Sequence, residues 1–118
     1  MATRQWASKE MPGGWLRATV TLTADGDVSD LLELPNWPQK NLQVVVGGAI
    51  TDLDIQQSND GVTFADLHQA HDPTLTFTSL VAAMQADVFE NPRYIKVTAY
   101  DEGAGGDTTI EICAYTSR

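Results

Sequence analysis

Apolar and polar residues alternate along several short stretches of the chain. In residues 15–23 the sequence Trp-Leu-Arg-Ala-Thr-Val-Thr-Leu-Thr places an apolar side chain at every second position from Leu16 on. This period of two is the pattern of a β-strand with one buried side and one side in solvent. Related patterns predict further strands at 42–46, 50–57, 62–67, 74–78, 94–100 and 108–115.

Turn-forming residues separate these stretches at short intervals. The sequence Ser-Asn-Asp-Gly at 58–61 predicts a tight hairpin turn, because asparagine, aspartate and glycine tolerate the positive φ that chain reversal requires. The glycine-rich segment 101–107 is expected to join the last two strands as a hairpin. Short strands with such turns are typical of sandwiches and jelly rolls. We therefore predict an all-β protein, an antiparallel, jelly-roll-like β-sandwich of about seven or eight strands.

Three segments depart from the strand pattern. Prolines interrupt residues 31–38, so this segment suits a short edge strand but not a central one. Residues 68–73 have the composition of a loop. Residues 79–87 concentrate helix formers behind Ser79, a residue type that caps helices. We expect at most one short helix, near 79–87.

The length of the chain favours a single domain. Its 118 residues, 42% of them hydrophobic, suffice for one core but not for two. The sequence Met-Pro-Gly-Gly at 11–14 breaks regular structure, so we expect an N-terminal arm at 1–14 and a single β-sandwich domain at 15–118. The opening residues lack the apolar stretch of a secretion signal, and no apolar run approaches membrane-spanning length. We therefore expect no membrane partner and no export.

The chain is strongly acidic, with a formal net charge of -9 and a pI near 4.3. Affinity for nucleic acid comes largely from Lys and Arg displacing counterions from phosphates, so nucleic acid is not an expected partner. The acidic surface instead favours solubility. Cys113 is the only cysteine, which excludes an intrachain disulfide.

Residues suited to catalysis or metal binding do not form a recognisable motif. His68 and His71 are followed by Asp72, but no cysteine or third histidine completes a tetrahedral metal site. Asp25 and Asp27 share a turn that offers oxygen ligands to calcium, yet the spacing of an EF-hand loop is not met. Nucleophile-elbow and zinc-protease motifs are also missing. We predict that the protein is not an enzyme and has no catalytic residues, bound metal or cofactor.

Aromatic and basic side chains in and after the arm are the candidates for partner binding. The indole of Trp6 either folds back onto the domain or anchors on a partner, since an aromatic on a terminal segment has both options. Trp37 stands between two prolines and is either a lid over the core or an exposed contact. The candidate partner-binding residues are Arg4, Trp6, Lys9, Trp15 and Trp37.

Two segments carry a resemblance to known families. In the first, Leu53 and Ile55 lead into the Ser-Asn-Asp-Gly turn at 58–61, and the second is the strand Arg-Tyr-Ile-Lys-Val at 93–97. Together they resemble the small jelly-roll proteins that decorate or cement the capsids of tailed bacteriophages. They resemble more weakly the discoidin-like, galactose-binding β-sandwich domains.

The first resemblance implies a structural virion protein that binds the outer surface of a tailed-phage capsid and cements neighbouring subunits. The major capsid protein would be its partner, and the chain would act as a homo-oligomer, either a dimer or a trimer. Its location would be the exterior of a capsid assembled in the bacterial cytoplasm. The alternative is a carbohydrate-binding module, or an accessory domain of a phage tail or adhesin, in which His68, His71 and Trp37 would contact a sugar.

Overall fold

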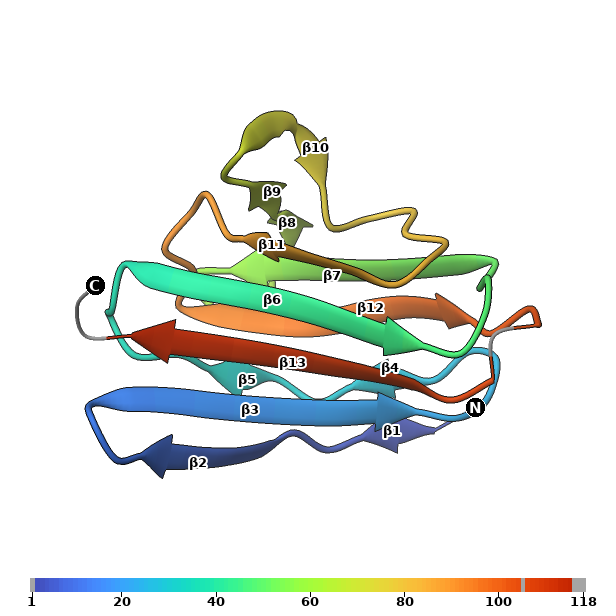
Figure 1. Cartoon of the computed structure of the whole chain (residues 1–118), viewed down its shortest axis with the longest axis horizontal. Coiled ribbons are helices and arrows are strands. Elements are labelled where there is room, and N and C mark those ends of the chain that lie inside the picture. Colours follow the sequence, from blue (N-terminus) through green and yellow to red (C-terminus); the bar gives the residue numbers. More distant parts are fainter. Residues whose placement is uncertain (1, 105, 116–118) are drawn as a thin grey trace.

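The computed structural model describes residues 2–104 and 106–115. These residues form thirteen β-strands and no helix, and most strands belong to two sheets packed face to face (Figure 1). Five of the thirteen strands are only two residues long, so eight longer strands remain. The prediction of an all-β sandwich is confirmed. None of the described residues lies in a helix long and apolar enough to cross a membrane.

The front layer in Figure 1 is a five-stranded sheet in which every neighbouring pair of strands is antiparallel. In order across the sheet, its strands are β11 (Met84–Asp87), β6 (Gln39–Val46), β13 (Thr108–Tyr115), β3 (Trp15–Leu22) and β2 (Ala7–Met11). The strand expected at 15–23 is therefore internal to this sheet, and β2 forms one edge.

The second layer is a four-stranded antiparallel sheet. In order, its strands are β5 (Leu32–Glu33), β12 (Tyr94–Asp101), β7 (Asp52–Ser58) and β8 (Ala65–Asp66). Two small ribbons complete the fold. In one, β1 (Thr3–Arg4) pairs in parallel with β4 (Val28–Ser29), and in the other β9 (His68–Gln69) pairs with β10 (Asp72–Thr76).

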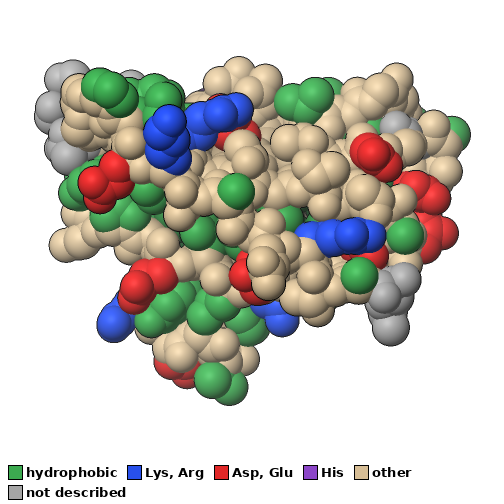
Figure 2. Space-filling view, turned by 90° about the horizontal axis from the view of Figure 1, so that it is seen from below, with side chains coloured by type: hydrophobic (Ala, Val, Ile, Leu, Met, Phe, Trp, Pro, Cys, Tyr) green, Lys and Arg blue, Asp and Glu red, His purple; other side chains and the backbone are tan. Residues whose placement is uncertain are grey.

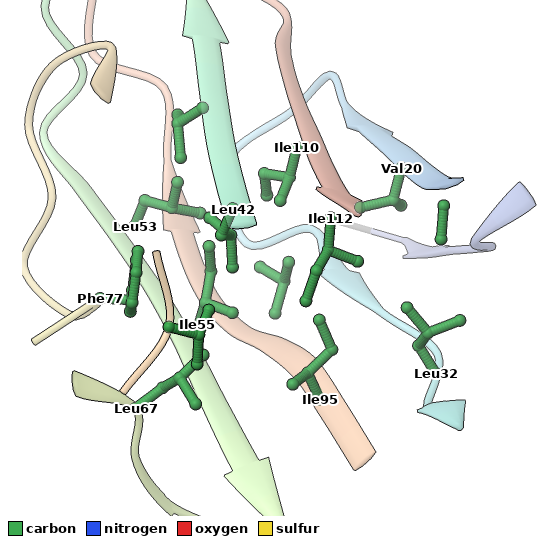
Figure 3. Packing of buried hydrophobic residues seen from close by; sticks show 14 of the residues in the cluster. Val20, Leu32, Leu42, Leu53, Ile55, Leu67, Phe77, Ile95, Ile110 and Ile112 are labelled. Atoms are coloured by element: carbon green, nitrogen blue, oxygen red, sulfur yellow. The ribbon is translucent and has the colours of Figure 1, made fainter. Parts of the chain in front are cut away.

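The hydrophobic core lies between the two sheets. Inward-facing positions alternate with outward-facing ones along the long strands, as the period of two requires. The labelled side chains in Figure 3 point toward one another from both layers, and they are all buried: Val20, Leu32, Leu42, Leu53, Ile55, Leu67, Phe77, Ile95, Ile110 and Ile112. Leu67 and Phe77 come from the segment between β8 and β11 and close one side of this core.

The turn after β7 reverses the chain through side-chain hydrogen bonds. The Ser58 hydroxyl accepts the Gly61 amide at 2.8 Å, and the Asp60 carboxylate accepts the Val62 and Thr63 amides at 2.9 Å. Gly61 has a φ of 79°, which only glycine adopts without strain. The chain then returns as β8, so the reversal expected at 58–61 is confirmed.

The two segments that carry the resemblance lie side by side. In the antiparallel pairing of β12 with β7, Tyr94 is opposite Ser58 and Val97 is opposite Ile55. The strands predicted at 50–57 and 94–100 are therefore neighbours in one sheet.

Two local expectations were wrong. Residues 101–107 do not close a hairpin, because β12 belongs to the four-stranded sheet and β13 to the five-stranded sheet, so the connection crosses between layers. Residues 68–73 are not a simple loop, because β9 and the start of β10 pair there.

The segment 79–87, for which at most one short helix was expected, contains none. Ser79 has a φ of 54° and its amide donates to the Asp54 carboxylate at 2.7 Å, so it does not cap a helix. Residues Met84–Asp87 instead pair with β6 as the edge strand β11. Pairing with a sheet has overridden the local helix propensity, which is a weak preference.

The N-terminal residues form strands that pair with later parts of the chain. Strand β2 pairs along its whole length with β3, and the first residue of β1 lies opposite Val28. Gly13 and Gly14, with φ of 95° and 81°, make the tight connection between β2 and β3. The segment 1–14, expected to be an arm, thus contributes an edge strand to the five-stranded sheet and one strand to a small ribbon.

Candidate binding surface

The outward face of the five-stranded sheet carries a row of apolar side chains at one end. Strand pairing places Trp15 on β3 directly opposite Tyr115 on β13, and also opposite Met11 on β2. Residues opposite each other on neighbouring strands point to the same side of a sheet. We call Met11, Trp15 and Tyr115 the aromatic corner.

The two rings of the aromatic corner are stacked and partly exposed. The rings of Trp15 and Tyr115 stack with centroids 5.8 Å apart and planes inclined by 20°. Tyr115 is 36% exposed, whereas Trp15 and Met11 are half-buried. Burial raises the pKa of the Tyr115 phenol above its usual value. Both rings therefore present apolar surface to solvent from positions fixed by strand pairing.

Basic side chains occupy the next row of the same face. Lys9 on β2 lies opposite Arg17 on β3. Arg17 donates to Glu111 on β13 through Nε and Nη2, each at 2.8 Å, while the exposed Lys9 makes no ion pair with another described residue. A depression of about 230 Å³ lies between the two strands. It is lined by Ala7, Ser8, Lys9, Met11, Arg17 and Thr19.

Figure 2 views the sandwich from the side of the β2 edge, and some of the Lys and Arg side chains lie together beside hydrophobic ones near one end, while others are spread over the view. Of the five candidate residues, Lys9 and Trp15 are thus brought together on one surface. The other three lie elsewhere.

Trp6 is folded back onto the domain. Its indole Nε1 donates to the Ser29 hydroxyl at 3.0 Å and to the Asp30 carbonyl at 3.1 Å, and the ring packs against the core. Its own amide donates to the Asp30 carboxylate at 3.0 Å. Of the two alternatives for this side chain, the structure has the one in which it contacts its own domain.

Arg4 is engaged with a buried carboxylate. Its Nε donates to Asp27 at 2.8 Å, and Asp27 is fully buried. The amides of Ala2, Thr23 and Ala24 also donate to this carboxylate, at 2.8 to 3.1 Å. Burial alone would raise the pKa of Asp27, but the hydrogen bonds from Thr23, Arg4, Ala24 and Ala2 outweigh it and hold the pKa well below its usual range.

Trp37 lies in the connection between β5 and β6 and is half-buried. Its carbonyl accepts a hydrogen bond from the Nζ atom of Lys40. Gln39, two residues further on, pairs with Tyr115, so Trp37 lies at the same end of the sandwich as the aromatic corner.

The histidine segment offers no metal site among the described residues. His68 Nδ1 lies 2.5 Å from a carboxylate oxygen of Glu90, whose other oxygen accepts the His68 amide at 2.8 Å. Within residues 2–104 and 106–115, no group of three or more His, Cys, Asp and Glu side chains is placed to hold a metal ion.

Sequence reasoning missed Met11 and Tyr115 as surface residues. Each is an ordinary strand residue by pattern, and it becomes part of a continuous apolar surface only through its register with Trp15. Alternation predicts which residues share a side of one strand, but not which strand lies next to it.

The comparisons bear on the fold. No protein-family model matches the chain, and no curated protein matches it. Among solved structures, the SPBc2 prophage-derived protein YomS is similar with a TM-score of 0.52 and 11% identity, covering 83% of this chain and 93% of that one. A cupin domain from Bordetella pertussis Tohama I aligns with a TM-score of 0.49 and 7% identity over 97% of this chain and 94% of that one. A Bacillus endospore appendage subunit aligns with a TM-score of 0.45 and 12% identity over 98% and 92%.

At 11% identity, the likeness to YomS concerns the fold alone. It shows that a solved structure shares much of the β-sandwich described above.

Proposed function

We propose that the chain is a structural protein of tailed-phage particles that binds the major capsid protein on the capsid exterior and cements neighbouring subunits. The observation that carries this proposal is the aromatic corner beside Lys9, on a protein whose net charge is -9. In this proposal the protein acts as a dimer or trimer, so that one assembly reaches more than one capsid subunit.

The composition of this surface suits protein binding. Aromatic residues, Met and Arg are enriched where protein interfaces are buried, and a few such residues usually supply most of the binding energy. Trp15 and Tyr115 already stack on each other, so little side-chain entropy is lost when a partner covers them. A standard interface of about 1,600 Å² would extend beyond the corner over the neighbouring rows of the same sheet face.

Charge gives the surface a preferred orientation. Lys9 and Arg17 lie next to the aromatic corner, while most of the remaining charged residues are acidic. A complementary acidic rim on the partner would favour contact through this face over contact through any other. The structural neighbour YomS comes from a prophage, which is in keeping with a phage origin for a protein of this fold.

The test is co-sedimentation with expanded, empty capsids of the phage that encodes the chain. Replacing Trp15 and Tyr115 by Ala should weaken capsid binding by more than about thirtyfold, since losing a central aromatic contact costs about 2 kcal/mol or more. The matched control replaces the exposed apolar residues Val62 and Leu75, which lie outside the five-stranded sheet, by Ala. Unchanged binding of the first variant, with its fold intact by circular dichroism, would refute the proposal.

A further inference from the structure

A second surface feature lies at the same end of the sandwich, between the β5–β6 and β11–β12 connections. It is a cleft of about 300 Å³. Its lining consists of Leu34, Pro35, Asn36, Asn91, Pro92 and Arg93. None of these residues belongs to the aromatic corner.

A buried lysine contacts Asn91, one of the residues that line the cleft. The side chain of Lys40 is only 2% exposed, and its Nζ donates to the Trp37 carbonyl and to the Asn91 side-chain oxygen. Both acceptors are neutral. No carboxylate of the described residues forms an ion pair with Lys40, and burial lowers the pKa of its amine to about 8. A buried ammonium without a counter-charge is energetically unfavourable.

Asn91 separates this amine from solvent. Its side chain is exposed, and its Nδ2 donates to the Asn36 side-chain oxygen at 2.7 Å. Rotation of this one side chain would open Nζ of Lys40 to the cleft. At the rim, the exposed Arg93 holds its guanidinium 5.4 Å from the centre of the Tyr94 ring.

We propose that the cleft binds a carboxylate group, with Lys40 as the buried counter-charge, Arg93 as the charge at the rim, and Asn36 and Asn91 as amide donors. In the bound state a carboxylate oxygen takes the place of the Asn91 oxygen at Nζ of Lys40. The displaced Asn91 amide and the Asn36 amide then donate to the ligand. Carboxylate binding in the cleft is independent of the proposed capsid attachment, because the two sites share no residue.

The chemistry of the cleft favours a carboxylate over other groups. A cation in a site of low dielectric gains most from a single opposite charge brought close to it. The carboxamides can donate to both oxygens of a planar carboxylate, and Arg side chains bind carboxylates through two parallel hydrogen bonds. The carboxylate can come from a peptide or from a small carboxylic acid.

The direct test is NMR titration of the isotope-labelled protein with acetate, using acetamide as a neutral control of the same shape. We expect acetate to cause saturable shifts confined to residues 34–40 and 91–93, and acetamide to cause none. The ε-carbon signal of Lys40 should also report a titration midpoint about 1 unit higher in saturating acetate, since a nearby opposite charge stabilises the ammonium. Equal shifts with acetamide, or no saturable shifts with acetate, would overturn the proposal.

Two variants sharpen the test. Lys40→Met should abolish acetate binding, whereas the control Lys96→Gln, on the outward side of the four-stranded sheet, should leave it unchanged. Asn91→Asp supplies an internal carboxylate, so it should raise the Lys40 midpoint without ligand and reduce acetate affinity at least tenfold. Acetate binding to Lys40→Met with wild-type affinity would contradict the assignment of Lys40.

One further measurement distinguishes a peptide ligand from a small carboxylic acid, and another tests whether the cleft and the aromatic corner are separate sites. A short glutamate-containing peptide with blocked ends that binds more tightly than acetate would identify a polypeptide ligand, and binding no tighter than acetate would identify a small acid. The Trp15→Ala and Tyr115→Ala double variant should keep full acetate binding, because the cleft does not include the aromatic corner. Loss of acetate binding in that variant would contradict a separate site.

Discussion

Among residues 2–104 and 106–115, two charged side chains, Asp27 and Lys40, are buried in the sandwich. Their neighbours compensate the two charges to different degrees. Asp27 accepts hydrogen bonds from Arg4 and from three backbone amides, so its negative charge is well satisfied. Lys40 meets only two neutral oxygens. At the residue scale, burial of the charged Asp27 therefore stabilises the folded protein, whereas burial of the charged Lys40 lowers the free energy of unfolding.

Because the ammonium of Lys40 is buried without a counter-charge, we expect the free energy of unfolding to depend on pH above neutrality. The pKa of its amine is about 8 in the folded protein, below the ordinary lysine value of 10.5. Between these values the unfolded chain binds more protons than the folded one, so the free energy of unfolding should rise with pH from about 8 to about 10.5. Below pH 8 the Lys40 amine is charged in the folded protein, so the full destabilisation from burying this charge is present.

The Lys40→Met variant should therefore be more stable than the wild type at pH 7, by about 1 to 3 kcal/mol, because a buried ion is replaced by an apolar side chain. Its unfolding free energy should also lack the rise above pH 8. Urea unfolding at pH 7 and pH 10 measures both effects, and Lys9→Gln, at an exposed position, is the control. A variant less stable than wild type at pH 7 would show that the hydrogen bonds of Lys40 outweigh its desolvation.

At the scale of elements, the N-terminal ribbon is held by side chains far along the chain. Strand β1 pairs with β4, and Ala2 and Arg4 supply two of the donors to buried Asp27. The indole of Trp6, two residues after β1, donates to Ser29 on β4. The hydrogen bonds and the ion pair to the buried Asp27 carboxylate therefore hold the N-terminal segment against the rest of the sandwich.

Removal of residues 1–6 should destabilise the protein by about 3 to 5 kcal/mol, because it leaves the Asp27 carboxylate buried without Arg4. Chemical unfolding of the truncated chain measures this loss. The control is Thr3→Ala, a change at an exposed position of the same strand that should cost less than about 0.5 kcal/mol. A truncated chain as stable as the wild type would mean that Asp27 gains other partners.

Alternation along the chain was enough to predict the long strands and the all-β class, because each long strand has one buried side. It did not predict β2, because nearly all residues of Ala7–Met11 are exposed on this edge strand and show no apolar period. The crossing of 101–107 between sheets was also missed, since glycine-rich loops suit hairpins and crossings equally. Trp15 was found as a surface candidate, but its neighbour Tyr115 required knowledge of strand register.

At the scale of the whole molecule, the sandwich measures 38 × 29 × 28 Å and carries a large negative charge with few basic residues. Two of those basic residues, Lys9 and Arg17, lie on the outward face of the five-stranded sheet beside the aromatic corner. Such an uneven distribution orients a protein as it approaches a charged partner.

Reversal of one of these charges should slow capsid attachment. Lys9→Glu should lower the association rate constant about three- to tenfold at low ionic strength, and the difference should shrink at 0.5 M salt because exposed charges are screened. Surface plasmon resonance on immobilised capsids measures the association rate constant at both salt concentrations. Lys96→Glu, on the other sheet, is the matched control. An equal decrease of the association rate constant in that variant would contradict attachment through the face that carries Lys9.

The proposed orientation on the particle is tested most directly by cryo-electron microscopy of capsids decorated with the protein. We predict density on the outer surface of the capsid in which the outward face of the five-stranded sheet, with Trp15 and Tyr115, contacts the major capsid protein. Density with this face turned to solvent, or saturated mixtures without any added density, would contradict the account.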